Sequence, residues 1–347
     1  MGERAIREPI LSVRDLKTYF YQDEGVIRAV DGVSFDVFAG KTLGIVGESG
    51  CGKSVTARSI LRIEEKPGRI VGGRILLYPR SAKAAGEPLE LAELDRGGRR
   101  LRDIRGNEIS LIFQEPMTSF SSHYTIGNQM MEALRLHQKL GKKEAKKKAI
   151  DLLDRVGIPR PARRIDEYPF QLSGGLRQRV MIAMALANNP RILIADEPTT
   201  ALDVTTQAQI LDLLRELQAQ FKMAIIIITH DMGVIAEIAD DVVVMYLGRV
   251  VETGPVDEIF HAPKHPYTEA LLRSIPNILA APRTKLPTLM GAIPHPYNRP
   301  RGCPFHPRCS RALGQCNRSE PQLLPIGERQ VVSCFLYQET PDMRKAD

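Results

Sequence analysis

Short apolar runs alternate with longer amphipathic stretches along most of the chain. Runs rich in Val, Ile and Leu predict buried β-strands, and the amphipathic stretches predict helices with one apolar face. The predicted strands are 42–46, 109–114, 192–196, 224–229 and 242–246, and the predicted helices are 55–61, 126–156, 174–187, 206–220 and 232–238. Strands without a polar face must be covered on both sides, so the alternation predicts an α/β fold with a mostly parallel sheet.

Both ends of the chain depart from this pattern. Residues 10–37 predict strands of an antiparallel subdomain, and 72–77 predict a hairpin that would extend it. Beyond residue 262 the chain is rich in Pro and has little periodicity, which is typical of a small irregular segment. We therefore expect a main domain over 1–262, with a helical subdomain at about 116–187, and a C-terminal extension over 263–347.

A glycine-rich stretch joins the first parallel strand to the helix that follows it. It matches the phosphate-loop pattern G-x-x-x-x-G-K-[ST] in full, in the strand–loop–helix context that this pattern requires. Glycines let backbone N–H groups approach an anion, and the helix N-terminus adds positive potential. The stretch predicts a nucleoside-triphosphate site and consists of Gly47, Glu48, Ser49, Gly50, Cys51, Gly52, Lys53 and Ser54, with Val55 after it.

Polar side chains end several of the other predicted strands. Asp196 and Glu197 follow an apolar strand, where one carboxylate can coordinate Mg²⁺ and the next can polarise a water molecule. Gln114 and His230 also end strands, although each residue taken alone indicates little. Ser173 begins a Ser-Gly-Gly turn that opens a helix, which makes a second potential anion site.

The order of these motifs over residues 10–260 resembles the ABC transporter ATPases. The phosphate loop, Gln114, a Leu-Ser-Gly-Gly signature, Asp-Glu, Ala-Leu-Asp and His230 follow one another as in that family. The resemblance implies a P-loop NTPase with a RecA-like parallel core, an antiparallel β subdomain and an α-helical subdomain. It also implies that two ATPases sandwich ATP head-to-tail and that their closure moves attached membrane subunits.

The resemblance further implies the catalytic and Mg²⁺-binding residues. Glu197 would be the general base and His230 would contact the γ-phosphate. Gln114 would sense Mg²⁺ and the attacking water, and would couple to the membrane subunits through the loop after it. Mg²⁺ would be held by Ser54, Gln114 and Asp196.

Other residues are implied to contact the nucleotide or a second ATPase. Ser173, Gly174 and Gly175 would touch the γ-phosphate held by the partner, and Asp203 would lie at the dimer seam. Phe20 aligns best with the aromatic residue that stacks on adenine, and the neighbouring Tyr19 stays an alternative. The fifth signature residue is Leu176 where the family often has Gln, which changes little if Ser and the backbone make the contacts.

Segments after residue 248 narrow the resemblance to the dipeptide/oligopeptide importer ATPases, including their C-terminal extension. They are 248–254, 265–272 and 302–309, and Met117-Thr118-Ser119 fits the same subfamily. The resemblance implies an ATP-hydrolysing importer subunit that works with two integral membrane permease subunits, a sister ATPase and an extracytoplasmic solute-binding protein. Alternatives are an importer of oligosaccharide, nickel or glutathione, or a non-transport ABC ATPase acting on nucleic acid or ribosomes.

Charge and hydropathy bear on where the chain works. The net charge of +7 and the pI of about 9.2 are compatible with nucleic acid or with the anionic cytoplasmic face of a membrane. Basic residues do not interleave with aromatic ones as on a nucleic-acid platform, so we expect no nucleic-acid partner. No window approaches the ~20 apolar residues of a membrane-spanning helix, and the N-terminus lacks a signal core. We expect a peripheral protein at the cytoplasmic face of the cell membrane.

Four of the five cysteines lie near the C-terminus, at positions 303, 309, 316 and 334. In a reducing compartment such clustering favours metal binding over disulfides. The spacings are wider than the usual zinc pairs and suit an iron–sulfur cluster held by four thiolates better. Some members of the subfamily that this chain resembles carry a 4Fe–4S cluster at such cysteines. We expect this cofactor at Cys303, Cys309, Cys316 and Cys334, with zinc or free thiols as alternatives.

Overall fold

The computed structural model describes residues 8–79, 87–115, 119–275, 289 and 291–338. The chain divides into two compact units. The first, which we call the phosphate-loop unit, consists of 11–36, 43–77 and 229–347. The second, which we call the helical unit, consists of 1–10, 37–42 and 78–228. The expected division at residue 262 stays a prediction.

A sheet built from both ends of the chain forms the centre of the phosphate-loop unit. The order of its strands is β11-β12-β10-β9-β3, with β3 parallel to β9 and the other pairs antiparallel. β3 (Thr42–Val46) is buried along its length, as its apolar sequence predicts. The remaining strands are β9 (Asp241–Tyr246), β10 (Arg249–Pro255), β11 (Leu324–Ile326) and β12 (Gln330–Val332). The C-terminal extension thus adds two short strands to the edge of the core sheet.

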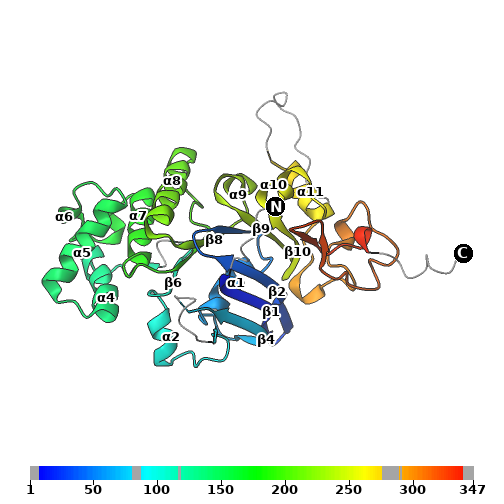
Figure 1. The fold of residues 1–347 in the computed structure, drawn as a ribbon, viewed down its shortest axis with the longest axis horizontal. Helices are drawn as coiled ribbons and strands as arrows, with labels where there is room; N and C mark the ends of the chain where they lie inside the picture. The colour runs from blue at the N-terminus through cyan, green and yellow to red at the C-terminus, as the bar shows by residue number, and fades with distance from the viewer. Residues whose placement is uncertain (1–7, 80–86, 116–118, 276–288, 290, 339–347) are drawn as a thin grey trace, which may run out of the picture. The chain divides into compact units, whose positions relative to one another are not determined.

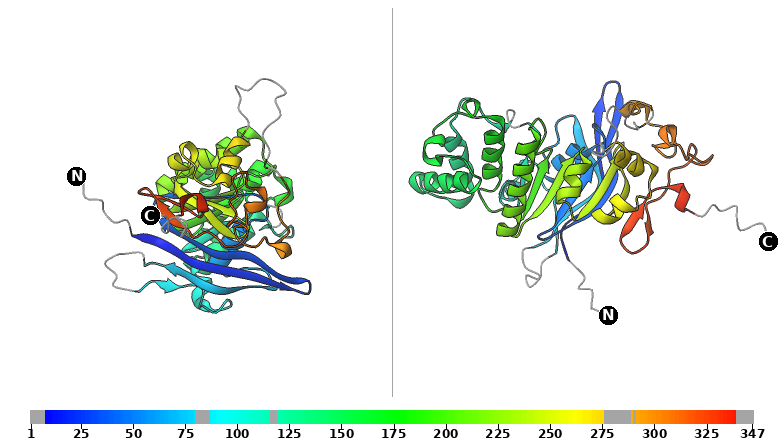
Figure 2. Two further views of the ribbon diagram at one scale, coloured as in Figure 1. Left: turned by 90° about the vertical axis from the view of Figure 1, so that its right-hand side faces the viewer. Right: turned by 90° about the horizontal axis from the view of Figure 1, so that it is seen from above.

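The predicted antiparallel subdomain is present, but one of its expected turns is wrong. β1 (Pro9–Gln22) lies between β2 (Gly25–Phe38) and β4 (Gly68–Leu77) (Figure 2). Residues 72–77 do not form a hairpin, because β4 runs through them unbroken. Gly73 has φ +87°, and a Cβ there would lie 2.4 Å from the Asp15 carbonyl oxygen. The glycine permits close approach of two strands at an irregularity in their register. Glycine commonly has this role within strands, as well as its role in turns.

Helices complete the phosphate-loop unit, and Figure 1 shows α10 and α11 beside the later part of the C-terminal extension. α1 (Lys53–Ile60) follows the phosphate loop directly. The other helices are α9 (Met232–Ile238), α10 (Val256–His261) and α11 (Pro266–Arg273). The rest of the described extension is mostly short turns, in keeping with its low periodicity.

The helical unit contains the remaining parallel strands in the order β8-β7-β6. They are β6 (Ile109–Ile112), β7 (Ile192–Asp196) and β8 (Ala224–Thr229), and a short β5 (Leu89–Glu90) also belongs to the unit. The helical pattern over 126–156 divides into two helices, because Lys139 takes a left-handed conformation with φ +54° that ends the first. The helices are α2 (Arg99–Ile104), α4 (Ile126–Gln138), α5 (Lys142–Arg155), α6 (Pro161–Arg164), α7 (Gly174–Ala185) and α8 (Val204–Phe221).

The architecture confirms the predicted α/β fold with parallel strands, an antiparallel sheet and a group of helices, of which α4, α5, α6 and α7 lie together in Figure 1. Within the ranges given above, every helix is too short or too polar to span a bilayer. Residues Pro116, Met117 and Thr118 lie outside the described ranges, so the structure does not bear on the predicted coupling loop there.

Candidate functional site

The phosphate loop connects the end of β3 to the start of α1, as the sequence predicts. Gly52 has φ +103°, and a Cβ at this position would lie 2.1 Å from the Ala29 carbonyl oxygen. Lys53 is only 5% exposed, and its ammonium group donates hydrogen bonds to the carbonyl oxygens of Gly47 at 2.7 Å and Glu48 at 3.1 Å. The lysine charge is therefore held against the loop, next to the N-terminus of α1, where an anion is favoured.

The two candidate aromatic residues on β1 are in different surroundings. The Tyr19 hydroxyl donates a hydrogen bond to Asp31 at 2.7 Å, and burial together with this bond raises the pKa of Tyr19 to about 12. Phe20 has no hydroxyl group to hold it, and its ring lies against Gly68, where a Cβ would come within 2.7 Å of the ring. Tyr19 is thus hydrogen-bonded within its own sheet.

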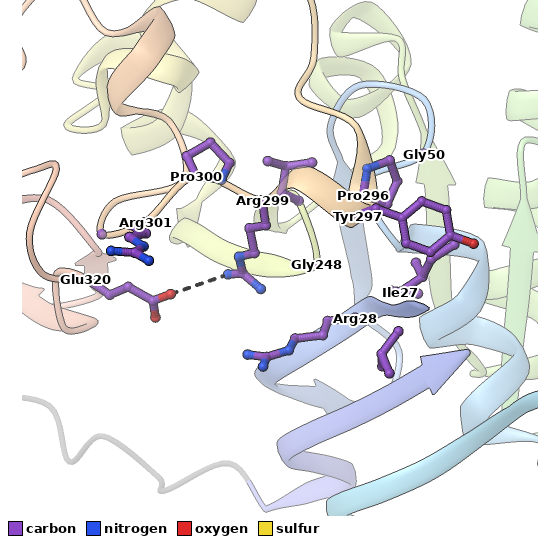
Figure 3. Close-up of a pocket in the computed structure, with 14 residues that line it drawn as sticks. Ile27, Arg28, Gly50, Gly248, Pro296, Tyr297, Arg299, Pro300, Arg301 and Glu320 are labelled. Carbon is purple, nitrogen blue, oxygen red and sulfur yellow. Dashed lines mark ion pairs between the residues drawn. The ribbon is translucent and has the colours of Figure 1, made fainter. Parts of the chain in front are cut away.

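A pocket of about 390 Å³ lies between the phosphate loop, β2 and the C-terminal extension (Figure 3). Arg299 of the extension donates a hydrogen bond to Asp31 at 2.7 Å and lies 3.8 Å from Glu320, the pair dashed in Figure 3. Burial opposes ionisation of Asp31, but the hydrogen bond from Tyr19 and the charges of Arg249 and Arg299 hold its pKa below the usual value. Other residues in the wall are Ile27, Arg28, Gly50, Gly248, Tyr297 and Arg301.

Two predicted catalytic residues meet in the helical unit. The side-chain amide of Gln114, just beyond β6, donates a hydrogen bond to the Glu197 carboxylate at 3.0 Å. The Thr200 hydroxyl donates to the same carboxylate oxygen at 2.8 Å. Glu197 itself has φ +49°, and its backbone N–H donates to Ile228 of β8. These contacts fix the carboxylate at the C-terminal edge of the parallel strands, where open α/β sheets bind ligands.

Oxygen donors of the kind that Mg²⁺ prefers are present at the predicted positions. Asp196 ends β7 and is 4% exposed, Ser54 lies in the first turn of α1, and Gln114 offers an amide oxygen. A carboxylate and an amide oxygen in the helical unit, and a hydroxyl in the phosphate-loop unit, each fit the chemistry of this ion. His230 follows β8 and is exposed, and it belongs to the phosphate-loop unit.

The signature residues and Asp203 cap helices at the surface of the helical unit. The Ser173 hydroxyl caps α7 by accepting the Leu176 N–H at 3.4 Å, and Ser173 and Gly174 are exposed. Gly175 follows in the first turn of α7, where it is partly exposed. Asp203 caps α8 by accepting both the hydroxyl at 2.7 Å and the N–H at 3.0 Å of Thr206, and these bonds lower the pKa of Asp203.

The four C-terminal cysteines lie in the phosphate-loop unit as free thiols. Cys303, Cys316 and Cys334 are buried, and Cys309 is partly exposed. Burial, with a smaller contribution from the charges of the three other cysteines, raises the pKa of Cys303 to about 11. In the part of the chain that the structure describes, no three His, Cys, Asp or Glu side chains are grouped as a metal site. The fifth thiol, Cys51, is buried in the phosphate loop.

Sequence reasoning missed several residues that the structure places at these sites. Thr200 is bonded to Glu197, and Arg308 and Tyr267 are bonded to Glu48 of the phosphate loop. Thr200 lies three residues after Glu197, so a turn could have suggested it. Nothing in the pattern links Arg308 to Glu48, because the two residues are 260 positions apart.

Comparisons with family models and with curated relatives give matches over most of the chain. Residues 30–200 match the ABC transporter family, and residues 251–316 match the family "Oligopeptide/dipeptide transporter, C-terminal region". A putative peptide import ATP-binding protein of Brucella abortus is 51% identical over 321 residues, covering 92% of this chain and 93% of the relative. The oligopeptide transport ATP-binding protein AppD of Bacillus subtilis is 48% identical over 331 residues, covering 95% and 97%.

Solved structures give the same result for the fold. A dimeric ATP-binding cassette in a post-hydrolysis state, bound to ADP and Pi, has a TM-score of 0.61 and 26% identity, covering 71% of this chain and 98% of that one. The structure of cbiO1 from Clostridium perfringens, part of an ABC transporter complex, has a TM-score of 0.58 and 29% identity, covering 74% and 92%.

Proposed function

We propose how the residues of this chain hydrolyse ATP and drive import. The premise is that the chain belongs to the ABC transporter ATPases of the oligopeptide/dipeptide importer type. The chain is an ATP-binding and ATP-hydrolysing subunit of a peptide importer. One observation supports our assignment of the chemistry most directly, namely the hydrogen bond from Gln114 to Glu197 at 3.0 Å. It brings a water-orienting amide and a carboxylate base together, each at the end of a parallel strand.

In the proposed mechanism the phosphate loop and Lys53 bind the β- and γ-phosphates of ATP. Ser54, Gln114 and Asp196 hold Mg²⁺, which supplies electrostatic stabilisation of the phosphoryl group when it is bound. Glu197 accepts a proton from the water that attacks the γ-phosphate, and the products are ADP and inorganic phosphate. Gln114 and Thr200 orient the Glu197 carboxylate, which two hydrogen bonds already fix in the structure.

The nucleotide is held by further residues in this proposal. Phe20 stacks on adenine, and His230 contacts the γ-phosphate. Ser173, Gly174 and Gly175 reach the ATP of a partner ATPase, and Asp203 lies at the seam between them. The exposure of Ser173, Gly174 and Asp203 supports this, because residues that serve a second molecule must be accessible. ATP then favours the closed pair, and closure moves the membrane subunits.

We assign the chain to the cytoplasmic face of the cell membrane as a peripheral subunit. Its partners in this proposal are two permease subunits, a sister ATPase and an extracytoplasmic solute-binding protein, with dipeptides or oligopeptides as the solute. A tagged pull-down from gently solubilised native membranes, with ATPase activity assayed on the eluate, tests it. Recovery of two membrane proteins and a second ATPase is the expected result. Recovery of ribosomes or DNA without membrane proteins would overturn the transport assembly while leaving the ATP site intact.

We further propose that the four C-terminal thiols hold a 4Fe–4S cluster. The Cys303 N–H donates a hydrogen bond to the Cys316 carbonyl oxygen at 2.8 Å, and this contact together with the burial of Cys303, Cys316 and Cys334 supports it. Four thiolates are the donor set of such a cluster. Protein purified without oxygen is expected to contain about four iron atoms per chain, and Cys309→Ser is expected to lower the iron content. Zinc without iron, or no metal, would refute the cluster.

A further inference from the structure

We propose that Arg308 of the C-terminal extension is a positioning residue for the phosphate loop and sets its affinity for ATP through Glu48. The guanidinium group donates two parallel hydrogen bonds to the Glu48 carboxylate, at 2.7 Å and 3.0 Å. The Arg308 side chain is only 4% exposed and that of Glu48 22% exposed. Such a forked and mostly buried ion pair fixes both position and orientation, unlike an exposed ion pair.

Glu48 is held from outside the loop at more than one point. Its backbone N–H donates a hydrogen bond to the Tyr267 hydroxyl of α11 at 2.9 Å. Its carbonyl oxygen in turn accepts hydrogen bonds from Lys53 at 3.1 Å and from the Cys51 N–H at 3.3 Å. A displacement of Glu48 therefore displaces an acceptor of the phosphate-binding lysine. Two parts of the extension, α11 and the turn that carries Arg308, together determine where the loop begins.

The ion pair also changes the electrostatic interaction between the phosphate loop and ATP. Glu48 is a carboxylate inside a loop whose ligand is a polyanion, and two like charges at short distance repel each other strongly where water is partly excluded. Arg308 neutralises this carboxylate and directs it toward the extension. Without Arg308, the half-buried carboxylate would be unpaired and free to turn toward the phosphates. The repulsion grows with ligand charge, so ATP should be affected more than ADP.

Arg308 is itself held by rigid surroundings. Its guanidinium group donates to the Tyr246 hydroxyl at 3.4 Å and lies 5.8 Å from the centre of the Tyr246 ring. The rings of Tyr246, Tyr267 and Phe305 pack on one another with centroids 4.8–5.4 Å apart. Arg308 ends a 3₁₀ turn, His306–Arg308, between Cys303 and Cys309. The turn between Cys303 and Cys309 thereby contacts the phosphate loop directly through the Arg308 side chain.

A double-mutant cycle on the full chain tests the proposal, with Kd for MgATP and MgADP measured by calorimetry. Arg308→Met is expected to weaken MgATP binding about tenfold or more and MgADP binding less, as expected when one partner of a desolvated charge pair is removed. Adding Glu48→Gln to Arg308→Met is expected to restore MgATP affinity to within about threefold of the wild type, because the unpaired carboxylate is gone. Arg308→Lys keeps the charge but cannot donate the two parallel hydrogen bonds, so the loss of MgATP affinity should be smaller than in Arg308→Met.

Arg329→Met is the matched control, because Arg329 also belongs to the extension and its ion-pair partner is Asp241 at 2.7 Å, outside the phosphate loop. Thermal unfolding of every variant separates loss of fold from loss of affinity. A merely structural role for Arg308 would lower stability and weaken ATP and ADP equally, without rescue by Glu48→Gln. That result, or an unchanged Kd in a folded Arg308→Met variant, would overturn the proposal.

Discussion

The phosphate loop of one unit and the signature residues of the other are held in opposite ways. In the phosphate-loop unit Glu48 is bonded to Arg308 and Tyr267, which are 260 and 219 positions away in sequence. In the helical unit Ser173 and Asp203 are exposed and are bonded to residues only three positions away. The phosphate loop is thus shaped by distant parts of the same chain, whereas the signature residues are fixed locally and remain open. Such open residues suit contact with a second molecule, and the enclosed loop suits binding of nucleotide by one chain.

The comparison predicts that binding and hydrolysis of ATP can be separated by mutation. We expect Glu197→Gln to lower the hydrolysis rate by at least ~100-fold, the scale of losing a general base, while ATP affinity stays near that of the wild type. The carboxylate belongs to the helical unit, and the phosphate-binding lysine to the other. Steady-state ATPase assays and equilibrium ATP titration measure the two quantities.

Asp212→Asn is the control for this variant, because Asp212 is an exposed carboxylate of the helical unit whose partner is Arg215 at 3.0 Å. It should hydrolyse ATP at the normal rate. Near-normal turnover in Glu197→Gln would remove the carboxylate from its role as base, and lost binding would contradict the separation.

A second prediction concerns the aromatic residues of β1. We expect Phe20→Ala to weaken ATP binding about tenfold, because stacking of an aromatic ring on a base contributes about 1–3 kcal/mol. Tyr19→Phe should leave ATP affinity unchanged and lower stability by about 1 kcal/mol, since it removes the hydrogen bond to Asp31. The opposite result, with affinity lost in Tyr19→Ala and kept in Phe20→Ala, would assign adenine stacking to Tyr19. Titration with a fluorescent ATP analogue and chemical denaturation distinguish the cases.

Features that depend on neighbouring residues were predictable from the sequence. The β3–loop–α1 segment was expected because an apolar run, a glycine pattern and a helix follow one another. Gln114 and Glu197 were each placed at the end of a strand, but the hydrogen bond between them, across 83 positions, was not predicted.

Features that depend on distant packing were not predictable. The glycines at 72–73 indicated a turn, but they permit close contact with β1, and a single sequence does not distinguish these uses. The bond between Arg308 and Glu48 depends on how the Pro-rich extension folds back, and no periodicity encodes that path.

The enclosed packing of the phosphate-loop unit also predicts a dependence of stability on pH. His265 is 1% exposed, and burial lowers its pKa to about 3, with a smaller effect of the Arg311 charge. Its ordinary pKa in the unfolded chain is about 6.5. Between these values the unfolded chain binds the proton and the folded chain does not, so stability falls as the pH drops below about 6.5. The expected slope is up to about 1.4 kcal/mol per pH unit.

Chemical denaturation at pH 7 and pH 5 measures this effect against His265→Asn, which keeps a side-chain acceptor for the N-terminus of α11. Between the two pH values, the free energy of unfolding of the wild type should fall by up to about 2 kcal/mol more than that of the variant. Equal losses would mean that His265 is protonated in the folded chain, which would contradict its enclosure beside Glu252 and Arg311.

Ser173 gives the smallest expected change in stability and the sharpest test of the open site. As a helix cap it contributes about 1 kcal/mol against Ala, whereas Gly in its place loses only a few tenths. If Ser173 were only a cap, Ser173→Ala and Ser173→Gly would differ in stability and both would hydrolyse ATP normally. If its hydroxyl contacts the nucleotide of a partner, both variants lower the ATPase rate of the assembled importer by a similar factor. Denaturation of the chain and ATPase assays on the assembly decide between a local and a shared role.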